Sequence, residues 1–122
     1  MKLSPLMAAV LSLAAIAQPT NVVGFPATST VAIAQDLNAR LSGKTFDAAY
    51  ADGTRVQSRF GADGSLFASA PGFTDSGRWR VEDGKLCGSL RKIGEFCNEA
   101  RFDAGALYLR RMNGEVIRYV PN

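Results

Sequence analysis

The stretch Gly77-Arg78-Trp79-Arg80-Val81-Glu82-Asp83-Gly84-Lys85-Leu86-Cys87 decides the fold of this chain. Its apolar residues Trp79 and Val81 alternate with arginines, which is the period of a strand with one buried face. The dipeptide Asp83-Gly84 that follows is a strong hairpin signal, because tight hairpin turns need the positive φ that Gly tolerates. The stretch therefore predicts a strand, a turn and an antiparallel strand.

The same turn signal recurs along the chain at intervals of 8 to 12 residues. The glycines that mark it are Gly53, Gly64, Gly72, Gly84, Gly94, Gly105 and Gly114. Turns at this spacing predict short strands that pair with their sequence neighbours. The predicted strands are 45–50, 55–60, 66–70, 77–81, 85–90, 95–102, 106–111 and 115–120.

A meander of this kind leaves two exposed edges unless the sheet curls and closes. We therefore expect an all-β fold, an antiparallel eight-stranded meander forming a small barrel or a curled half-barrel. A two-sheet sandwich is the alternative, because the turns alone do not exclude it. A short helix over 37–41, capped by Asp36, is expected to precede the sheet and to plug one end.

The first 17 residues predict a secretory signal peptide. Lys2 gives a positive start, 3–17 is an apolar run, and Ala15-Ile16-Ala17 offers a cleavage site. Ala32-Ile33-Ala34 is an alternative site with the same local pattern. A membrane anchor would need about 20 apolar residues, so no transmembrane segment is expected in the mature protein. The expected location is the periplasm or the exterior of the cell.

The rest of the chain divides into two parts. Residues 18–40 are expected to be a linker and the short helix, with 18–34 either a tether or the remainder of a long signal. Residues 41–122 form the barrel-like domain. The formal net charge of the whole chain is +3, and removal of Lys2 with the signal leaves +2. Without a dense basic stripe, nucleic acid is not an expected partner.

The cysteines Cys87 and Cys97 lie in neighbouring predicted strands, on either side of the turn at Gly94. Facing residues of a hairpin come close enough for a disulfide, and an oxidising compartment favours one. By alternation the pair falls on the polar face, so the bond either staples the outer surface or follows a bulge near Gly88. Two sulfurs without histidine make a poor zinc site, and no metal or cofactor is expected.

Trp79 is the single tryptophan and has two interpretations. It anchors the core, or it forms a stacking wall for an apolar or sugar ligand in the mouth of the barrel. The same choice applies to five other aromatic residues, Tyr50, Phe60, Phe96, Tyr108 and Tyr119.

Arginines project from the outer face of the predicted strands. They could form a patch for the phosphate or carboxylate groups of lipid heads, envelope polymers or an acidic partner protein. Alternatively, they only keep the outer face soluble. These residues are Arg55, Arg59, Arg78, Arg80 and Arg101.

Catalysis has little support in the sequence. The chain contains no histidine, which removes the commonest general base and the usual nucleophile triads. The candidate carboxylates Asp52, Asp63, Asp83 and Asp103 all fall in predicted turns. No catalytic residue is expected.

Three runs, 41–46, 60–65 and 77–87, followed by Cys97, resemble a recurrent pattern of small exported proteobacterial β-rich proteins of unknown function. The most specific part is a Gly-x-Trp strand that leads through an Asp-Gly turn into Leu-Cys. The resemblance implies export, a β-rich fold and a disulfide, and it implies no catalytic residue.

The expected function is a non-enzymatic periplasmic or secreted β-domain that binds a partner protein or an envelope component. One alternative is a structural or stress-protective envelope protein without a specific ligand, which would have a filled interior. Another is a small hydrolase, which would need two carboxyl groups facing one another in a cleft.

Overall fold

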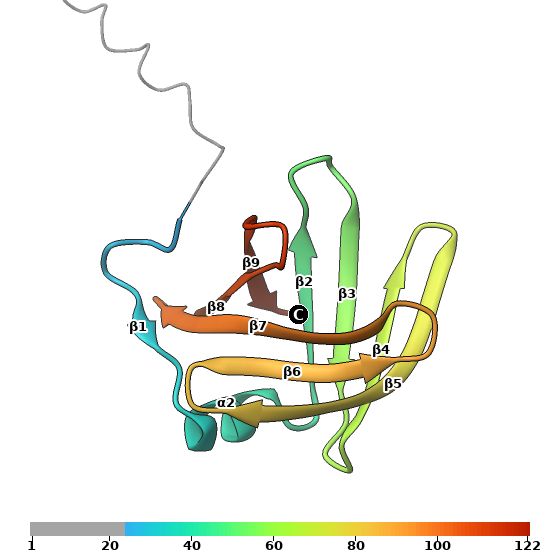
Figure 1. Cartoon of the computed structure of the whole chain (residues 1–122), viewed down its shortest axis with the longest axis horizontal. Helices are drawn as coiled ribbons and strands as arrows, with labels where there is room; N and C mark the ends of the chain where they lie inside the picture. Colours follow the sequence, from blue (N-terminus) through green and yellow to red (C-terminus); the bar gives the residue numbers. More distant parts are fainter. Residues whose placement is uncertain (1–23) are drawn as a thin grey trace, which may run out of the picture.

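The computed structural model describes residues 24–122, whose eight long strands close into an antiparallel barrel (Figure 1). These strands are β2 (Lys44–Ala49), β3 (Arg55–Phe60), β4 (Ser65–Ala70), β5 (Phe73–Glu82), β6 (Lys85–Leu90), β7 (Gly94–Asp103), β8 (Ala106–Arg110) and β9 (Val116–Pro121). Each pairs with the next along the chain, and β9 returns to β2, where Val120 faces Asp47. The predicted eight-stranded meander is confirmed in its closed form, and the sandwich is excluded.

The turn prediction is also correct. All the glycines that marked the turns have positive φ, between 76° and 97°. In the β7–β8 turn Ala104 also has a positive φ, of 50°, and is the one non-glycine residue of the described part that does. Because each strand is antiparallel to the next, the connections alternate between the two ends of the barrel.

Strand β5 begins at Phe73, four residues before the predicted start at 77. The run Thr74-Asp75-Ser76 has the composition of a turn, but Asp75 is only 6% exposed. Its carboxylate accepts hydrogen bonds from the backbone of the neighbouring β6–β7 turn. A polar residue can therefore extend this strand because its partners lie in the next connection.

The helix α2 (Ala34–Leu41) begins earlier than predicted, and Asp36 does not cap it. The N-cap residue is Ile33, which has no side-chain cap bond. The carboxylate of Asp83, in the β5–β6 turn, instead accepts a hydrogen bond from the backbone N–H of Ala34 at 2.8 Å. The capping group thus comes from a distant part of the chain, which a local sequence pattern does not reveal.

Helix α2 lies across one end of the barrel (Figure 1) and contacts β5 and β2. Its apolar residues Leu37 and Leu41 are fully buried. Above them Phe60 packs edge-to-face on Trp79, with ring centroids 5.5 Å apart. This layer fills the helix end of the barrel, which we call the closed end.

Residues just before the helix pack on the barrel. A short strand, β1 (Thr30–Val31), pairs with β7. Ala32 is 1% exposed and exchanges backbone hydrogen bonds with Ala100 and Gly84. The part of 18–34 that the structure describes is therefore integrated into the fold. The predicted signal peptide, residues 1–17, lies outside the described residues.

Cys87 and Cys97 form a disulfide and occupy directly opposed positions in β6 and β7. Gly88 faces Phe96 in the same register, so no bulge intervenes. The bond lies on the outer wall, where Cys97 is exposed and Cys87 is covered. Of the two predicted arrangements, the disulfide on the outer surface is therefore the correct one.

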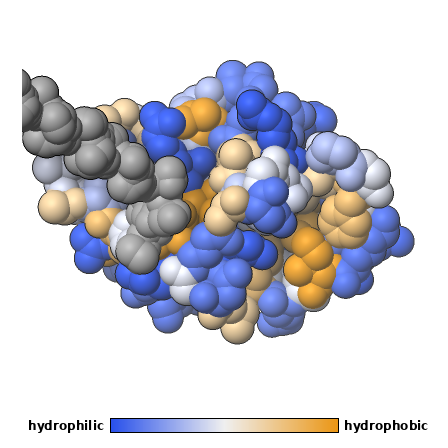
Figure 2. All heavy atoms as spheres, turned by 90° about the horizontal axis from the view of Figure 1, so that it is seen from above, coloured by the Kyte–Doolittle hydropathy of each residue, from blue (hydrophilic) through white to orange (hydrophobic). Residues whose placement is uncertain are grey.

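Seen from above, the surface is mostly hydrophilic and carries separate hydrophobic patches (Figure 2). No helix in the described part of the chain has the length and apolar character to cross a membrane.

Candidate functional site: a cavity inside the barrel

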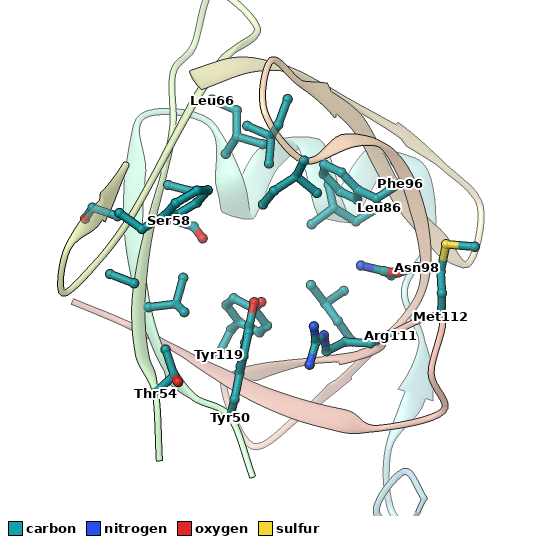
Figure 3. Close-up of a pocket in the computed structure, with 18 of the residues that line it drawn as sticks. Tyr50, Thr54, Ser58, Leu66, Leu86, Phe96, Asn98, Arg111, Met112 and Tyr119 are labelled. Atoms are coloured by element: carbon teal, nitrogen blue, oxygen red, sulfur yellow. The ribbon is translucent and has the colours of Figure 1, made fainter. Parts of the chain in front are cut away.

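A cavity of about 580 Å³ occupies the barrel at the end opposite α2 (Figure 3). It is hollow because the inner positions at this level carry small side chains. Ser58 of β3 faces Ala68 of β4, and Ala70 follows on the same face. Large inner side chains replace them towards the closed end, where Phe60 faces Leu66. The cavity therefore has an apolar floor and an opening between the hairpin turns.

Apolar side chains form the floor and one side of the cavity. Phe60, Leu66, Leu86 and Leu109 are all nearly inaccessible to solvent. Phe96 extends this surface along β7 (Figure 3). Such a wall favours the apolar body of a ligand, and the volume falls in the range of small-molecule sites.

Polar side chains also line the cavity: Asn98 lies on β7, Arg111 just after β8, Tyr119 on β9 and Tyr50 just after β2. Figure 3 shows Asn98, Arg111, Tyr119 and Tyr50 directed into the open space. These groups supply hydrogen-bond donors from an amide, a guanidinium and two phenols. The cavity is thus amphipathic, and Ser58 and Thr54 add hydroxyl groups on the side of β3 (Figure 3).

Arg111 is held in place by two neighbours. Its Nη1 donates to Oε1 of Glu115 at 2.7 Å, and its Cζ lies 4.3 Å from the centroid of the Tyr50 ring. Oε2 of Glu115 accepts in turn from the backbone N–H of Ala51 at 2.6 Å. Since a guanidinium carries five N–H donors, a fixed Arg111 retains the capacity to bind a further acceptor.

The side chain of Tyr119 is buried, and its hydroxyl lies near that of Tyr50 (Figure 3). Burial, followed by the neighbouring Tyr50, raises the pKa of Tyr119 well above its ordinary value. The phenol therefore stays protonated at any physiological pH. It acts as a neutral donor or acceptor and adds no negative charge beside Arg111.

Asp75 fixes one of the turns at the mouth of the cavity, the β6–β7 turn. Its carboxylate accepts from the backbone N–H groups of Lys92, at 3.0 Å, and Ile93, at 2.9 Å, as well as from Ser76. Burial would raise the pKa of Asp75, but these donors and the charge of Lys92 together hold it below its usual value. The ionised side chain thus secures the β6–β7 turn at the mouth.

Trp79 lies below the cavity and is not among the residues that line it. It is 8% exposed, and its indole N–H donates to the carbonyl of Gly61 at 2.9 Å. Its place is in the packed layer at the closed end, which corresponds to the core interpretation.

The arginines singled out in the sequence are spread over the outer wall. Arg55 and Arg59 lie on β3, Arg78 and Arg80 on β5, and Arg101 on β7. These strands are separated from one another by β4 and β6. Several of the side chains have local contacts: Arg78 donates to the carbonyl of Asp63, Arg59 lies over the Phe67 ring, and Arg101 lies over the Phe25 ring.

The sequence did not single out Arg111, Asn98, Ser58 or Asp75. Tyr50, Tyr119 and Phe96 were candidates only as aromatic residues. A usable signal was present in the small residues at inward positions of successive strands, such as Ser58 and Ala68. Because their side chains cannot fill a barrel, they indicate a hollow level.

The described residues that line the cavity include no carboxylate, and the chain has no histidine. Glu82 lies near both cysteines, but the sulfurs are bonded to each other and are not free to ligate a metal. Among known proteins, no family model matches this chain and no curated protein matches it significantly.

Proposed function

We propose that this chain is a non-enzymatic periplasmic or secreted protein that binds a small amphipathic component of the cell envelope inside its barrel. The observation that carries the proposal is the cavity of about 580 Å³, which has an apolar floor and polar side chains, Arg111 among them, along its walls. A filled interior, expected of a purely structural protein, is not what the barrel has.

The proposed ligand has an apolar body and a head group that accepts hydrogen bonds. The body would lie against Phe60, Leu86 and Phe96, where burial of apolar surface drives binding. The head would meet Arg111 and Asn98. A carboxylate or phosphate is the chemistry that a fixed guanidinium recognises best.

An extracytoplasmic location supports the same proposal. The disulfide on the outer wall is typical of oxidising compartments. Cleavage after Ala17 suits the fold better than cleavage after Ala34, because the latter would remove β1 and the buried Ala32. We therefore favour a mature chain that begins at Gln18.

Two fluorescent probes test the cavity. We expect 1-anilinonaphthalene-8-sulfonate, which is anionic, and N-phenyl-1-naphthylamine, which is neutral, to bind with a stoichiometry of one. Ala68→Phe should abolish binding of both, because it places a ring in the cavity. The control Gln57→Phe adds the same ring on the exposed outer face of β3 and should leave binding unchanged.

Arg111→Gln tests the contact with the head group separately from the apolar contact. We expect it to weaken binding of the anionic probe by about tenfold, the value of a charge-assisted hydrogen bond, and to leave binding of the neutral probe unchanged. Equal binding by the native protein and Ala68→Phe, or no binding at all, would overturn the proposal. If Arg111→Gln weakened binding of both probes equally, the part of the proposal that gives the ligand an anionic head group would be wrong.

A further inference from the structure

The turns around the mouth of the cavity carry exposed apolar side chains. Phe73 follows the β4–β5 turn, Ile93 lies in the β6–β7 turn and Met112 in the β8–β9 turn. Their exposed fractions are 39%, 59% and 83%. All three also line the cavity mouth, so they form one rim and not scattered surface positions. We call these three residues the apolar rim.

Basic side chains lie directly beside the apolar rim. Arg91 and Lys92 precede Ile93 in the β6–β7 turn, and Arg111 precedes Met112. The ammonium group of Lys92 lies 5.2 Å from the centroid of the Phe73 ring, so the charge is held next to an apolar group. Alternation of apolar tips and basic residues is the composition of a surface that enters the interface of an anionic bilayer.

The turns at this end, 50–54, 71–72, 91–93 and 111–115, carry three basic and two acidic side chains. The acidic ones are Asp52 and Glu115, and Glu115 is paired with Arg111. Asp75 is buried beneath the β6–β7 turn. The turns therefore present a small excess of positive charge, which the exposed Arg91 and Lys92 carry.

The closed end has the opposite character. Its turns carry Asp63, Asp83 and Asp103, and the described turns there, 61–64, 83–84 and 103–105, contain no lysine or arginine. The turns at the two ends thus differ in charge, although Arg40 of α2 and the first residues of β2 and β6, Lys44 and Lys85, are basic. This asymmetry orients the molecule on a negative surface with the cavity mouth facing it.

We infer that the open end docks on an anionic lipid surface, with the apolar rim inserted among the head groups and with Arg91 and Lys92 at the phosphates. The cavity then opens directly into the bilayer interface, and an amphipathic ligand passes between bilayer and barrel without crossing water. The exchange role rests on the proposed function, whereas the docking surface stands on the rim alone.

Vesicle flotation tests the docking. We expect the native protein to float with phosphatidylcholine vesicles that contain phosphatidylglycerol and to remain in solution with phosphatidylcholine alone. The triple variant Phe73→Ser, Ile93→Ser, Met112→Ser should lose binding by about tenfold or more. The matched control is Val31→Ser with Ile33→Ser, which removes exposed apolar side chains at the closed end and should bind normally.

The charge contribution is tested by Arg91→Gln with Lys92→Gln. We expect about a tenfold loss of binding that grows smaller as salt is added, because screening already weakens the native contact. Circular dichroism checks that each variant is folded. Binding that survives both rim variants, or that is equal for neutral and anionic vesicles, would overturn the inference.

Two further results are decisive. Ala68→Phe fills the cavity and leaves the rim intact, so this variant should still float with anionic vesicles. If it floats but no longer binds the probes, docking on the bilayer is independent of ligand binding. If the native protein does not float but elutes as a dimer that the triple variant dissociates, the rim is a contact between copies, and the lipid inference is wrong.

Discussion

The carboxylate of Asp75 in β5 accepts a hydrogen bond from the backbone N–H of Ile93, 18 residues further along the chain, at 2.9 Å. This bond ties a buried strand position to the turn that carries one side chain of the apolar rim. The ionised Asp75 therefore helps to hold Ile93 in its place in the rim.

Stability should depend on pH through Asp75. Its pKa is lower in the folded protein than in the unfolded chain, so the ionised form stabilises the fold above about pH 4 and this contribution disappears as the pH falls through the folded pKa. We expect Asp75→Asn to lower Tm by several degrees at neutral pH and by progressively less in acid. Thermal unfolding across this pH range measures the difference.

The control for this prediction is Asp36→Asn, which removes an exposed helical carboxylate. A loss of Tm in Asp75→Asn that stays constant down to the lowest pH would contradict the assignment, because it would mean that the charge of Asp75 contributes nothing.

The disulfide should stabilise the barrel measurably. It closes a loop between residues 10 apart, for which the chain-entropy estimate is about 2–3 kcal/mol. We expect the double variant Cys87→Ala, Cys97→Ala to lose this much free energy of unfolding in urea titrations. Reduced native protein should match the variant. Two thiols titrated in the unreduced native protein would show that the bond is absent.

The β7–β8 turn offers a stabilising substitution. Ala104 has a φ of 50°, a conformation that costs an ordinary residue about 1–2 kcal/mol and that Asn tolerates better. We expect Ala104→Asn to raise the free energy of unfolding by about 0.5–1 kcal/mol. Ala62→Asn, at an exposed turn position with negative φ, is the control. Equal effects of the two substitutions would argue against the strain at Ala104.

The fold was predictable because its signals are local. Each positive-φ glycine marks one turn, and the alternation between the turns assigns the two faces of each strand. The start of β5 was missed because Asp75 has its partners in another hairpin. The cap of α2 was missed for the same reason, since Asp83 is distant from Ala34 in the sequence.

The site was less predictable, because a cavity is a property of side-chain volumes across several strands. Trp79 was the most conspicuous candidate, yet it lies in the packed layer below. Ser58 and Ala68 create the space, but they are ordinary residues when considered one strand at a time. Their significance depends on the register that places them opposite each other.

Pairing of β2 with β9 gives the barrel its closure, and it is also the contact that most separates the folding of the barrel from the folding of its hairpins. The side chain of Asn122 donates to Asp47 across 75 positions of sequence, whereas every other strand pair of the barrel joins neighbours along the chain. Until β9 pairs with β2, one edge of β2 has no partner strand. Because a contact between distant residues must first overcome the entropy of closing a long loop, barrel closure is the slow step of folding and hairpin formation the fast one.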